Sequence, residues 1–235
     1  MRMLRKTMGE SIRGILPSID GKLQVPRRTW PLRHMSYVCV MEVNRSIEVL
    51  QRGLAEIRQS PTDRGQLRAI VIRPETDARV SLQMCELSPA LGVHGDNWAK
   101  GCWLSLPDGR PHPDVQVAIM NARAIDLLAG HRDRWPLAGD NLYIDMDLSD
   151  ANLPGGQRLA IGTAELEITA NPHNGCQKFG QRFGNDAVKF VNSTEGKRLH
   201  LRGIYAKVVK SGVVRVGDIV SKLGNPQPKA GGDSA

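Results

Sequence analysis

The sequence predicts a mainly β protein, a β-barrel or strongly bent sheet that carries a few short helices. Short apolar runs rich in β-branched residues recur from residue 67 to residue 222, and turn residues separate them at regular intervals. Few stretches have helical spacing, and strands and helices do not alternate as in a doubly wound sheet. The chain contains neither a phosphate loop nor a dinucleotide fingerprint. With 235 residues and 40% hydrophobic composition, it is expected to fold as one large or two small globular domains.

The two ends of the chain differ from this pattern. Residues 1–43 are predicted to be a basic disordered arm or sequence upstream of a later start, at Met35 or Met41. Residues 1–34 alone hold 8 Lys and Arg against 2 acidic residues, whereas the rest is nearly balanced at 24 against 22. Charge alone is a weak sign of a partner, so nucleic-acid binding is the less favoured interpretation. The composition of residues 223–235 predicts a disordered tail.

No apolar run approaches the roughly 18 residues that cross a bilayer. The basic start also lacks the apolar segment of a secretory signal. We therefore expect a cytoplasmic protein with no membrane partner.

The first predicted helix covers residues 44–58, within an N-terminal helix and linker region of residues 44–66. Asn44 or Ser46 could cap this helix. Its apolar residues repeat at helical spacing, at Ile47, Leu50, Leu54 and Ile57.

The main domain is predicted over residues 67–222 and begins with strands. A second helix is expected over 121–130, with Asn121 as its cap and Gly130 as its stop. A hairpin should turn near Gly162 and Thr163. The strand-like stretches are residues 67–74, 79–84, 115–120, 141–146 and 157–169.

The last part of the domain is also expected to be strand-rich. Residues 201–223 are predicted to form a hairpin that turns at Ser211-Gly212, with a further turn at Gly217-Asp218 before the last strand. If residues 197–203 are a strand, His200 and Arg202 share one face, which could bind a phosphate or simply be solvated.

Cys176 is the strongest candidate for chemistry. It follows the turn sequence "NPHNG", and the "QKFGQRF" that comes next could form a short helix with Phe179 and Phe183 on one face. A helix start and nearby cations such as Lys178 and Arg182 lower the pKa of a thiol, and the thiolate is the reactive form. Cys176 is therefore either an exposed reactive thiol or a buried residue at the edge of the core.

The four cysteines, Cys39, Cys85, Cys102 and Cys176, show neither a CxxC pair nor a Cys-His zinc spacing, and they are too sparse for a disulfide scaffold. We expect at least three of them to be buried packing residues.

Other polar loop residues could line a pocket. Asp96, Asn97 and Asn141 are candidate rim residues, although small polar loops more often just make turns. His112 and His173 each stand beside a proline in a loop, where a histidine is usually solvated.

Taken in order, these segments resemble a MOSC domain, the C-terminal domain of molybdenum cofactor sulfurases that also occurs in stand-alone bacterial proteins. The resemblance covers roughly residues 67–222. Its landmarks are "ELSPALGVHGDNWAKG", "VQVAIMNARAIDLLAG", "AGDNLYIDMDLSDANLPGGQRLAIGTAELEIT", "NPHNGCQKF" and "RGIYAKVVKSGVVRVGDIV". Relatives often have proline directly before the cysteine, where this chain has Gly175, and a His-Gly-Gly loop where it has His112-Pro113-Asp114.

The resemblance implies a MOSC-like β-barrel with one functional cysteine, which corresponds to Cys176. In the family this cysteine carries sulfur as a persulfide or ligates molybdenum in members that hold the cofactor. Soft thiolate suits both roles. The implied contacts of the cofactor are Lys178, Arg182, His200, Arg202, Asp96, Asn97 and Asn141.

The resulting hypothesis is a protein that handles molybdenum cofactor, a sulfur carrier or a small reductase of N-hydroxylated compounds. Such a reductase needs an electron-donor protein because the chain has no flavin or iron–sulfur motif, and a sulfur carrier needs a sulfur donor. Pyridoxal phosphate belongs to the desulfurase domain of the larger sulfurases, and nothing in this chain supports it. The alternative is a non-catalytic β-barrel module that binds a small anion or a protein, with Cys176 as a structural residue.

Overall fold

The computed structural model describes residues 44–224. The predicted basic arm, Cys39 and nearly all of the predicted tail lie outside this range, although Leu223 belongs to the last strand. Within it, seven strands close into a barrel in the order β11-β7-β8-β9-β5-β6-β1, and β1 pairs with β11 to complete the circle. The prediction of a mainly β, barrel-like fold is therefore confirmed.

All pairs in the barrel are antiparallel except β5 and β6. The barrel strands are β1 (Gly65–Ile72), β5 (Val117–Asn121), β6 (Leu142–Asp145), β7 (Arg158–Ile161), β8 (Ala164–Ile168), β9 (Ile204–Lys210) and β11 (Ile219–Leu223). β2 (Val80–Leu82) pairs antiparallel with the last residues of β1, Ile70 to Ile72. A second sheet of three strands has the order β10 (Gly212–Arg215), β3 (Met84–Ser88) and β4 (Gly92–Val93).

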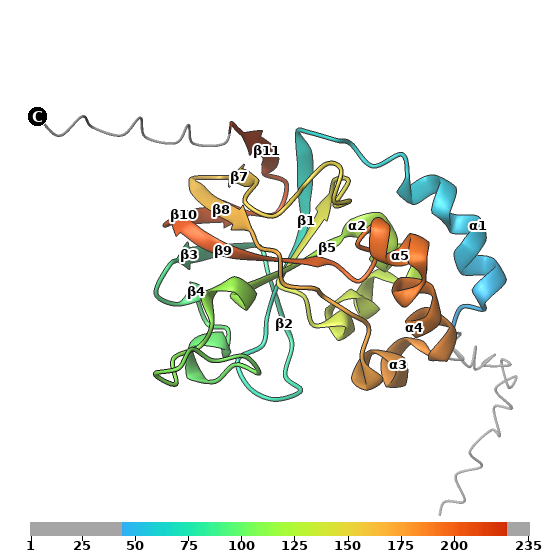
Figure 1. Ribbon diagram of the computed structural model, residues 1–235, viewed down its shortest axis with the longest axis horizontal. Coiled ribbons are helices and arrows are strands. Elements are labelled where there is room, and N and C mark those ends of the chain that lie inside the picture. The colour runs from blue at the N-terminus through green and yellow to red at the C-terminus, as the bar shows by residue number, and fades with distance from the viewer. Residues whose placement is uncertain (1–43, 225–235) are drawn as a thin grey trace, which may run out of the picture. The chain divides into compact units, whose positions relative to one another are not determined.

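The helices gather on one side of the barrel (Figure 1). They are α1 (Ile47–Ile57), α2 (Ala122–Ala129), α3 (Gln177–Phe183), α4 (Asn185–Asn192) and α5 (Thr194–Arg198). Three short 3-10 helices are η1 (Trp98–Lys100), η2 (Pro113–Val115) and η3 (Arg132–Ala138). The parallel pair β5 and β6 is joined by α2 and η3, because parallel neighbours need a long crossover.

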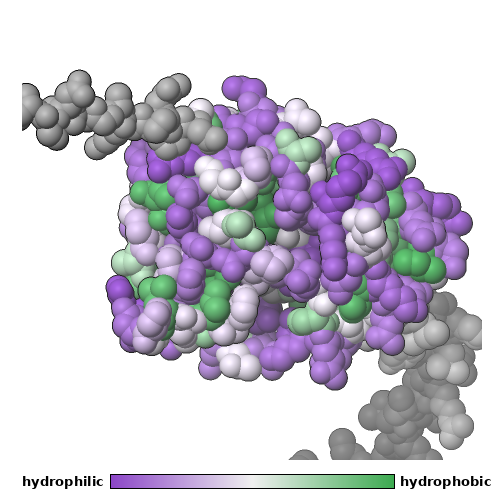
Figure 2. Space-filling view, in the orientation of Figure 1, coloured by the Kyte–Doolittle hydropathy of each residue, from purple (hydrophilic) through white to green (hydrophobic). Residues whose placement is uncertain are grey.

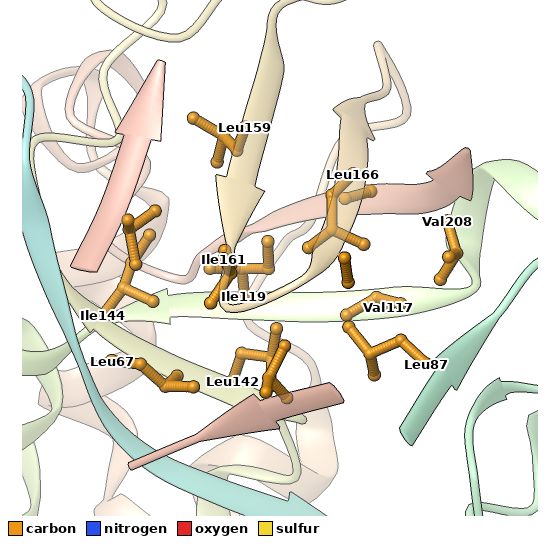
Figure 3. Close-up of a cluster of buried hydrophobic side chains, with 14 of the residues drawn as sticks. Leu67, Leu87, Val117, Ile119, Leu142, Ile144, Leu159, Ile161, Leu166 and Val208 are labelled. Carbon is orange, nitrogen blue, oxygen red and sulfur yellow. The ribbon is translucent and has the colours of Figure 1, made fainter. Parts of the chain in front are cut away.

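Alternation along the strands creates two cores. In β5, Val117 and Ile119 point into the barrel, whereas Met120 points outward to the helices. Inside the barrel, aliphatic side chains from several strands point toward one another (Figure 3). The outer core packs the apolar faces of the helices against the barrel, and its aromatic members include Phe179 and Phe183.

The predicted helices and the first hairpin are confirmed. α2 is capped at its N-terminus by Asn121, whose side chain accepts hydrogen bonds from the backbone N–H groups of Arg123 and Ala124. Its C-cap is Gly130, whose φ of 69° is the left-handed value expected of a glycine stop. β7 and β8 form the hairpin around residues 162–163, with Ile161 opposite Ala164.

The predicted hairpin at Ser211-Gly212 is wrong. β9 pairs with β5 and β8 in the barrel, whereas β10 leaves it and pairs with β3. Gly212 is needed for close approach rather than for a two-residue turn, because a Cβ there would lie 2.3 Å from the backbone carbon of Thr163. Residues 197–203 are not a strand, which was the condition for His200 and Arg202 to share one face; they form the end of α5 and a turn.

None of the helices between residues 44 and 224 is long and apolar enough to cross a membrane. The face shown in Figure 2 is mostly hydrophilic, and its hydrophobic residues lie in small separate patches.

Candidate functional site

A cavity of about 600 Å³ opens where the loop after β1, the loop before β6 and the start of α3 meet. We call it the arginine cavity after the basic side chains that line it. Two acidic side chains, Glu75 and Asp77, also line it, and Trp103 stands at its wall with 70% of its surface exposed. The basic side chains that define the cavity are Arg73, Arg79, Lys178, Arg182 and Arg202.

Cys176 lines this cavity and is exposed. It occupies the N-cap position of α3, and its carbonyl accepts a hydrogen bond from the N–H of Gly180. α3 is anchored below by Phe179 and Phe183, which are buried with ring centroids 4.8 Å apart. Hydrophobic anchoring on one face of the helix thus leaves the thiol at the open end.

The residue before the cysteine is held by a two-point clamp from α4. The Asn192 side chain accepts a hydrogen bond from the N–H of Gly175 and donates one to its carbonyl, each at 2.9 Å. A side chain on Gly175 would meet Val191, because a Cβ there would lie 2.7 Å from Val191 Cγ2. Glycine and the amide clamp together fix the backbone that leads into Cys176.

Two guanidinium groups stand side by side in the wall. A Cβ on Gly139 would lie 3.4 Å from Arg79 Nη2 and 3.8 Å from Arg182 Nη1, so both groups border the same point. Arg182 donates to the carbonyl of Leu137 and to the exposed Asp77. Arg79 forms no ion pair with any residue from 44 to 224, and its buried Nε has no hydrogen-bond partner there. Burial and the charges of Arg182 and Arg73 lower the pKa of Arg79, which indicates uncompensated positive potential.

The other two arginines, Arg202 and Arg73, each form an ion pair with a buried carboxylate. Arg202 Nη1 donates to both oxygens of the fully buried Asp140, at 3.0 and 2.7 Å. Arg73 forms a forked pair with Asp96, at 3.0 and 2.9 Å. Burial acts to lower the pKa of Arg73, but hydrogen bonding to Asp96 and the negative charges of Asp96 and Asp140 together outweigh it, so the pKa is raised. These pairs hold rigid cations in the wall.

The structure brings some of the predicted site residues together and separates others. Cys176, Lys178, Arg182, Arg202 and Asn97 all line the arginine cavity. His200 does not: it lies in the turn after α5, bonded to Asp150 at 2.8 Å, and borders a neighbouring cavity.

Asp96 and Asn141 are buried structural residues rather than rim residues. Asn141 donates to Asp96 at 2.9 Å and accepts from Arg73 and from the N–H of Ala118. Asp96 also accepts from the backbone N–H of Trp98. Their place in the site is indirect, because they hold Arg73 against the end of β1.

Expectations for the remaining cysteines and histidines were partly wrong. Cys85 is buried, but Cys102 is partly exposed and Cys176 is exposed. The prediction that at least three of the four cysteines are buried is therefore wrong. His173 was expected to be solvated in its loop, yet 91% of its side chain is buried, since only 9% is exposed. His112 caps η2 by accepting from the N–H of Asp114.

No local signal in the sequence marks Arg73, Arg79 or Tyr205 as cavity residues, and His173 was considered only as a loop histidine. Arg73 and Arg79 reach the cavity of Cys176 through contacts between segments about 100 residues apart, which periodicity does not report. The residues described by the structure contain no cluster of three or more His, Cys, Asp or Glu side chains that could hold a metal by themselves.

Residues 108–221 match the family model of the MOSC domain. The chain contains a MOSC domain. The predicted resemblance is confirmed, and Cys176, Lys178, Arg182 and Arg202 lie inside the matched region. Arg73 and Arg79 lie before it, so the cavity is completed by residues outside the match.

Among solved structures, this chain is similar to the YuaD protein from Bacillus subtilis, with 16% sequence identity and a TM-score of 0.48. The likeness covers 67% of this chain and 94% of the YuaD chain. This chain is also similar to YiiM from Escherichia coli, with 15% identity, a TM-score of 0.45 and coverage of 69% and 72%. A search of the curated proteins found no match.

Proposed function

We propose that the arginine cavity binds molybdenum cofactor and that Cys176 is its metal ligand or, alternatively, a sulfur carrier. The observation that supports this most is that an exposed thiol shares its cavity with Arg79, a half-buried arginine whose side chain forms no ion pair with any residue from 44 to 224 and whose Nε has no hydrogen-bond partner there. Thiolate is a soft ligand that suits molybdenum and sulfur transfer, and arginine suits phosphate. The donor set therefore fits an anionic ligand that carries a soft metal.

Residues at the two ends of α3 would bind different parts of the ligand. Arg182 follows Cys176 by six residues, which at 1.5 Å per residue separates them by about 9 Å along the helix. Cys176 would hold the soft centre, while Arg79, Arg182 and Lys178 would hold the phosphate of the pterin. When bound, the group would supply redox or sulfur chemistry that the side chains lack.

The exposure of Cys176 favours this proposal over a non-catalytic module. If Cys176 were a packing residue, its thiol would be buried like that of Cys85. A reductase of N-hydroxylated compounds is the concrete enzymatic form of the proposal. It would take electrons from a partner protein, and the substrate would enter the cavity of about 600 Å³ that Cys176 and Trp103 line.

Metal and pterin content test the proposal directly. The full chain would be purified from a host that makes molybdenum cofactor, beside Cys176→Ser and, as a matched control, Cys102→Ser. We expect molybdenum in the wild type and in Cys102→Ser, and its loss from Cys176→Ser. If Cys176→Ser keeps as much pterin and molybdenum as the wild type, cofactor binding stands but Cys176 is not the metal ligand.

Absence of both molybdenum and pterin from the wild type would contradict stable cofactor binding. Sulfur carriage would then be tested by persulfide labelling and mass spectrometry of the Cys176 peptide, with the Cys102 peptide as internal reference. No persulfide at Cys176 after incubation with a sulfur donor would remove this second form of the proposal.

A further inference from the structure

His173 stands at the wall between two cavities. It lies three residues before Cys176 and lines both the arginine cavity and a neighbouring cavity of about 410 Å³. Its ring stacks on Tyr205 of β9, with centroids 4.3 Å apart and an interplanar angle of 26°. The stacking fixes the plane of the imidazole, so its two nitrogens have defined surroundings.

The two nitrogens are not equivalent. Nδ1 is buried and lies 3.5 Å from Oδ1 of Asp140, too far for a normal hydrogen bond, and it has no other partner among residues 44–224. Nε2 also forms no hydrogen bond there, but it is not among the buried unpartnered atoms. Because Nδ1 faces Asp140, Nε2 is the nitrogen left to exchange a proton with a ligand in a cavity that the ring lines. Because Nδ1 faces a carboxylate, the proton of the neutral ring belongs on Nδ1.

The surroundings of His173 are largely cationic. The charged and titratable groups that face it are Asp140, Arg202, Arg73, His200 and Tyr205. Burial lowers the pKa of His173 well below its usual range, and the charges of Arg202, Arg73 and His200 lower it further. Asp140 offsets little of this, because both its oxygens already accept from Arg202. Without an anion in the cavity, the ring is neutral.

An anion in the arginine cavity would change this balance. It would lie close to the guanidinium groups whose positive charges disfavour protonation of His173. A negative charge near a histidine favours its protonated form. We propose that His173 is the proton donor of this site, and that it takes up its proton when an anionic ligand enters the arginine cavity.

The proton step balances without electron transfer. A solvent proton adds to the lone pair of Nε2, giving an imidazolium whose charge is balanced by the bound anion. On donation the Nε2–H bond breaks, its electron pair stays on nitrogen, and the proton joins an oxygen or nitrogen of the ligand. Asp140 is the positioning residue. This inference rests on the proposed binding of an anion in the arginine cavity.

Ligand-coupled protonation can be measured on the full chain by NMR. The histidine rings would be labelled with carbon-13, and the His173 resonance identified by its loss in His173→Gln. The probe is inorganic sulfate, which keeps its charge across the titration range. We expect sulfate to raise the midpoint of the His173 titration by about one pH unit, equal to about tenfold tighter binding to the protonated form.

Two controls make the result specific. Arg79→Gln should weaken sulfate binding and reduce the shift, and sulfate should leave the resonance of the exposed His131 unchanged in both proteins. Sulfate-dependent changes in the Arg79 Nε–H signal report binding independently. Binding at Arg79 with an unmoved His173 midpoint would overturn the inference and leave the proposed anion site intact. No sulfate-dependent change at Arg79 at any pH would overturn both.

Discussion

Replacing Asn192 with alanine should loosen the segment that presents Cys176. The substitution removes two 2.9 Å hydrogen bonds between the end of α4 and the backbone of Gly175. Each neutral hydrogen bond contributes about 1 kcal/mol net, so we expect a loss of about 2 kcal/mol in the free energy of unfolding. With a urea m-value of about 2 kcal/mol/M, the unfolding midpoint should fall by about 1 M.

The matched control is Asn185→Ala. Asn185 lies at the other end of the same helix, is exposed, and its side chain forms no hydrogen bond with residues 44–224. Its substitution should change the midpoint little. Asn192→Asp gives an intermediate case, since it retains the acceptor for the Gly175 N–H but loses the donor to the carbonyl.

A second assay separates local from global effects. The rate of Cys176 alkylation would be measured against that of Cys102 in the same sample, by mass spectrometry under native conditions. If the clamp orders the segment, the ratio of the two rates changes in Asn192→Ala and is partly restored in Asn192→Asp. An unfolding midpoint and a rate ratio both equal to those of Asn185→Ala would refute the reasoning.

Three further substitutions test other parts of the fold. Tyr143→Phe removes the buried 2.8 Å bond to the carbonyl of Trp135 and should cost about 1–2 kcal/mol in chemical denaturation; a cost below about 0.5 kcal/mol would contradict this. Gly203→Ala should destabilise by at least about 3 kcal/mol, because φ is 110° and a Cβ would lie 2.4 Å from the Ile119 carbonyl; an unchanged melting temperature would count against it. Hydrogen bonds from Arg198 and Arg58 lower the pKa of Glu195 from 4.5 to about 2, so its contribution to stability is present above pH 4.5 and is lost as the pH falls toward 2. Glu195→Gln should remove that part of the acid unfolding curve, and an unaltered curve would show that the group contributes nothing.

Local signals predicted the elements whose structure is set locally. The cap at Asn121 and the stop at Gly130 fixed α2, and the spacing of Phe179 and Phe183 predicted the face that α3 buries. The hairpin at residues 162–163 was also predictable, because both its strands are adjacent in sequence and in space.

Long-range contacts decided what was missed. The Ser211-Gly212 turn looked like a hairpin, but β10 gains its partner, β3, from more than 100 residues earlier in the chain. Asp96 and Asn141 looked like rim residues until both were found bonded to Arg73, which lies far from them in sequence. The candidate thiol was predictable from its turn, and Arg182 and Arg202 were named as candidates, whereas Arg73 and Arg79 were not.

The pairing of β1 with β11 has a consequence for folding. Gly65 meets Val220 and Gln66 meets Ile219, so the first and last strands of the barrel are neighbours although about 150 residues separate them. Closing so long a loop is entropically unfavourable and is a slow step in forming a β topology. Until β11 arrives, one edge of β1 has unpaired backbone groups, and such edges can pair with another chain. The late stage of refolding is therefore where protein concentration should matter most, since there each chain either closes its own barrel or joins a neighbour's.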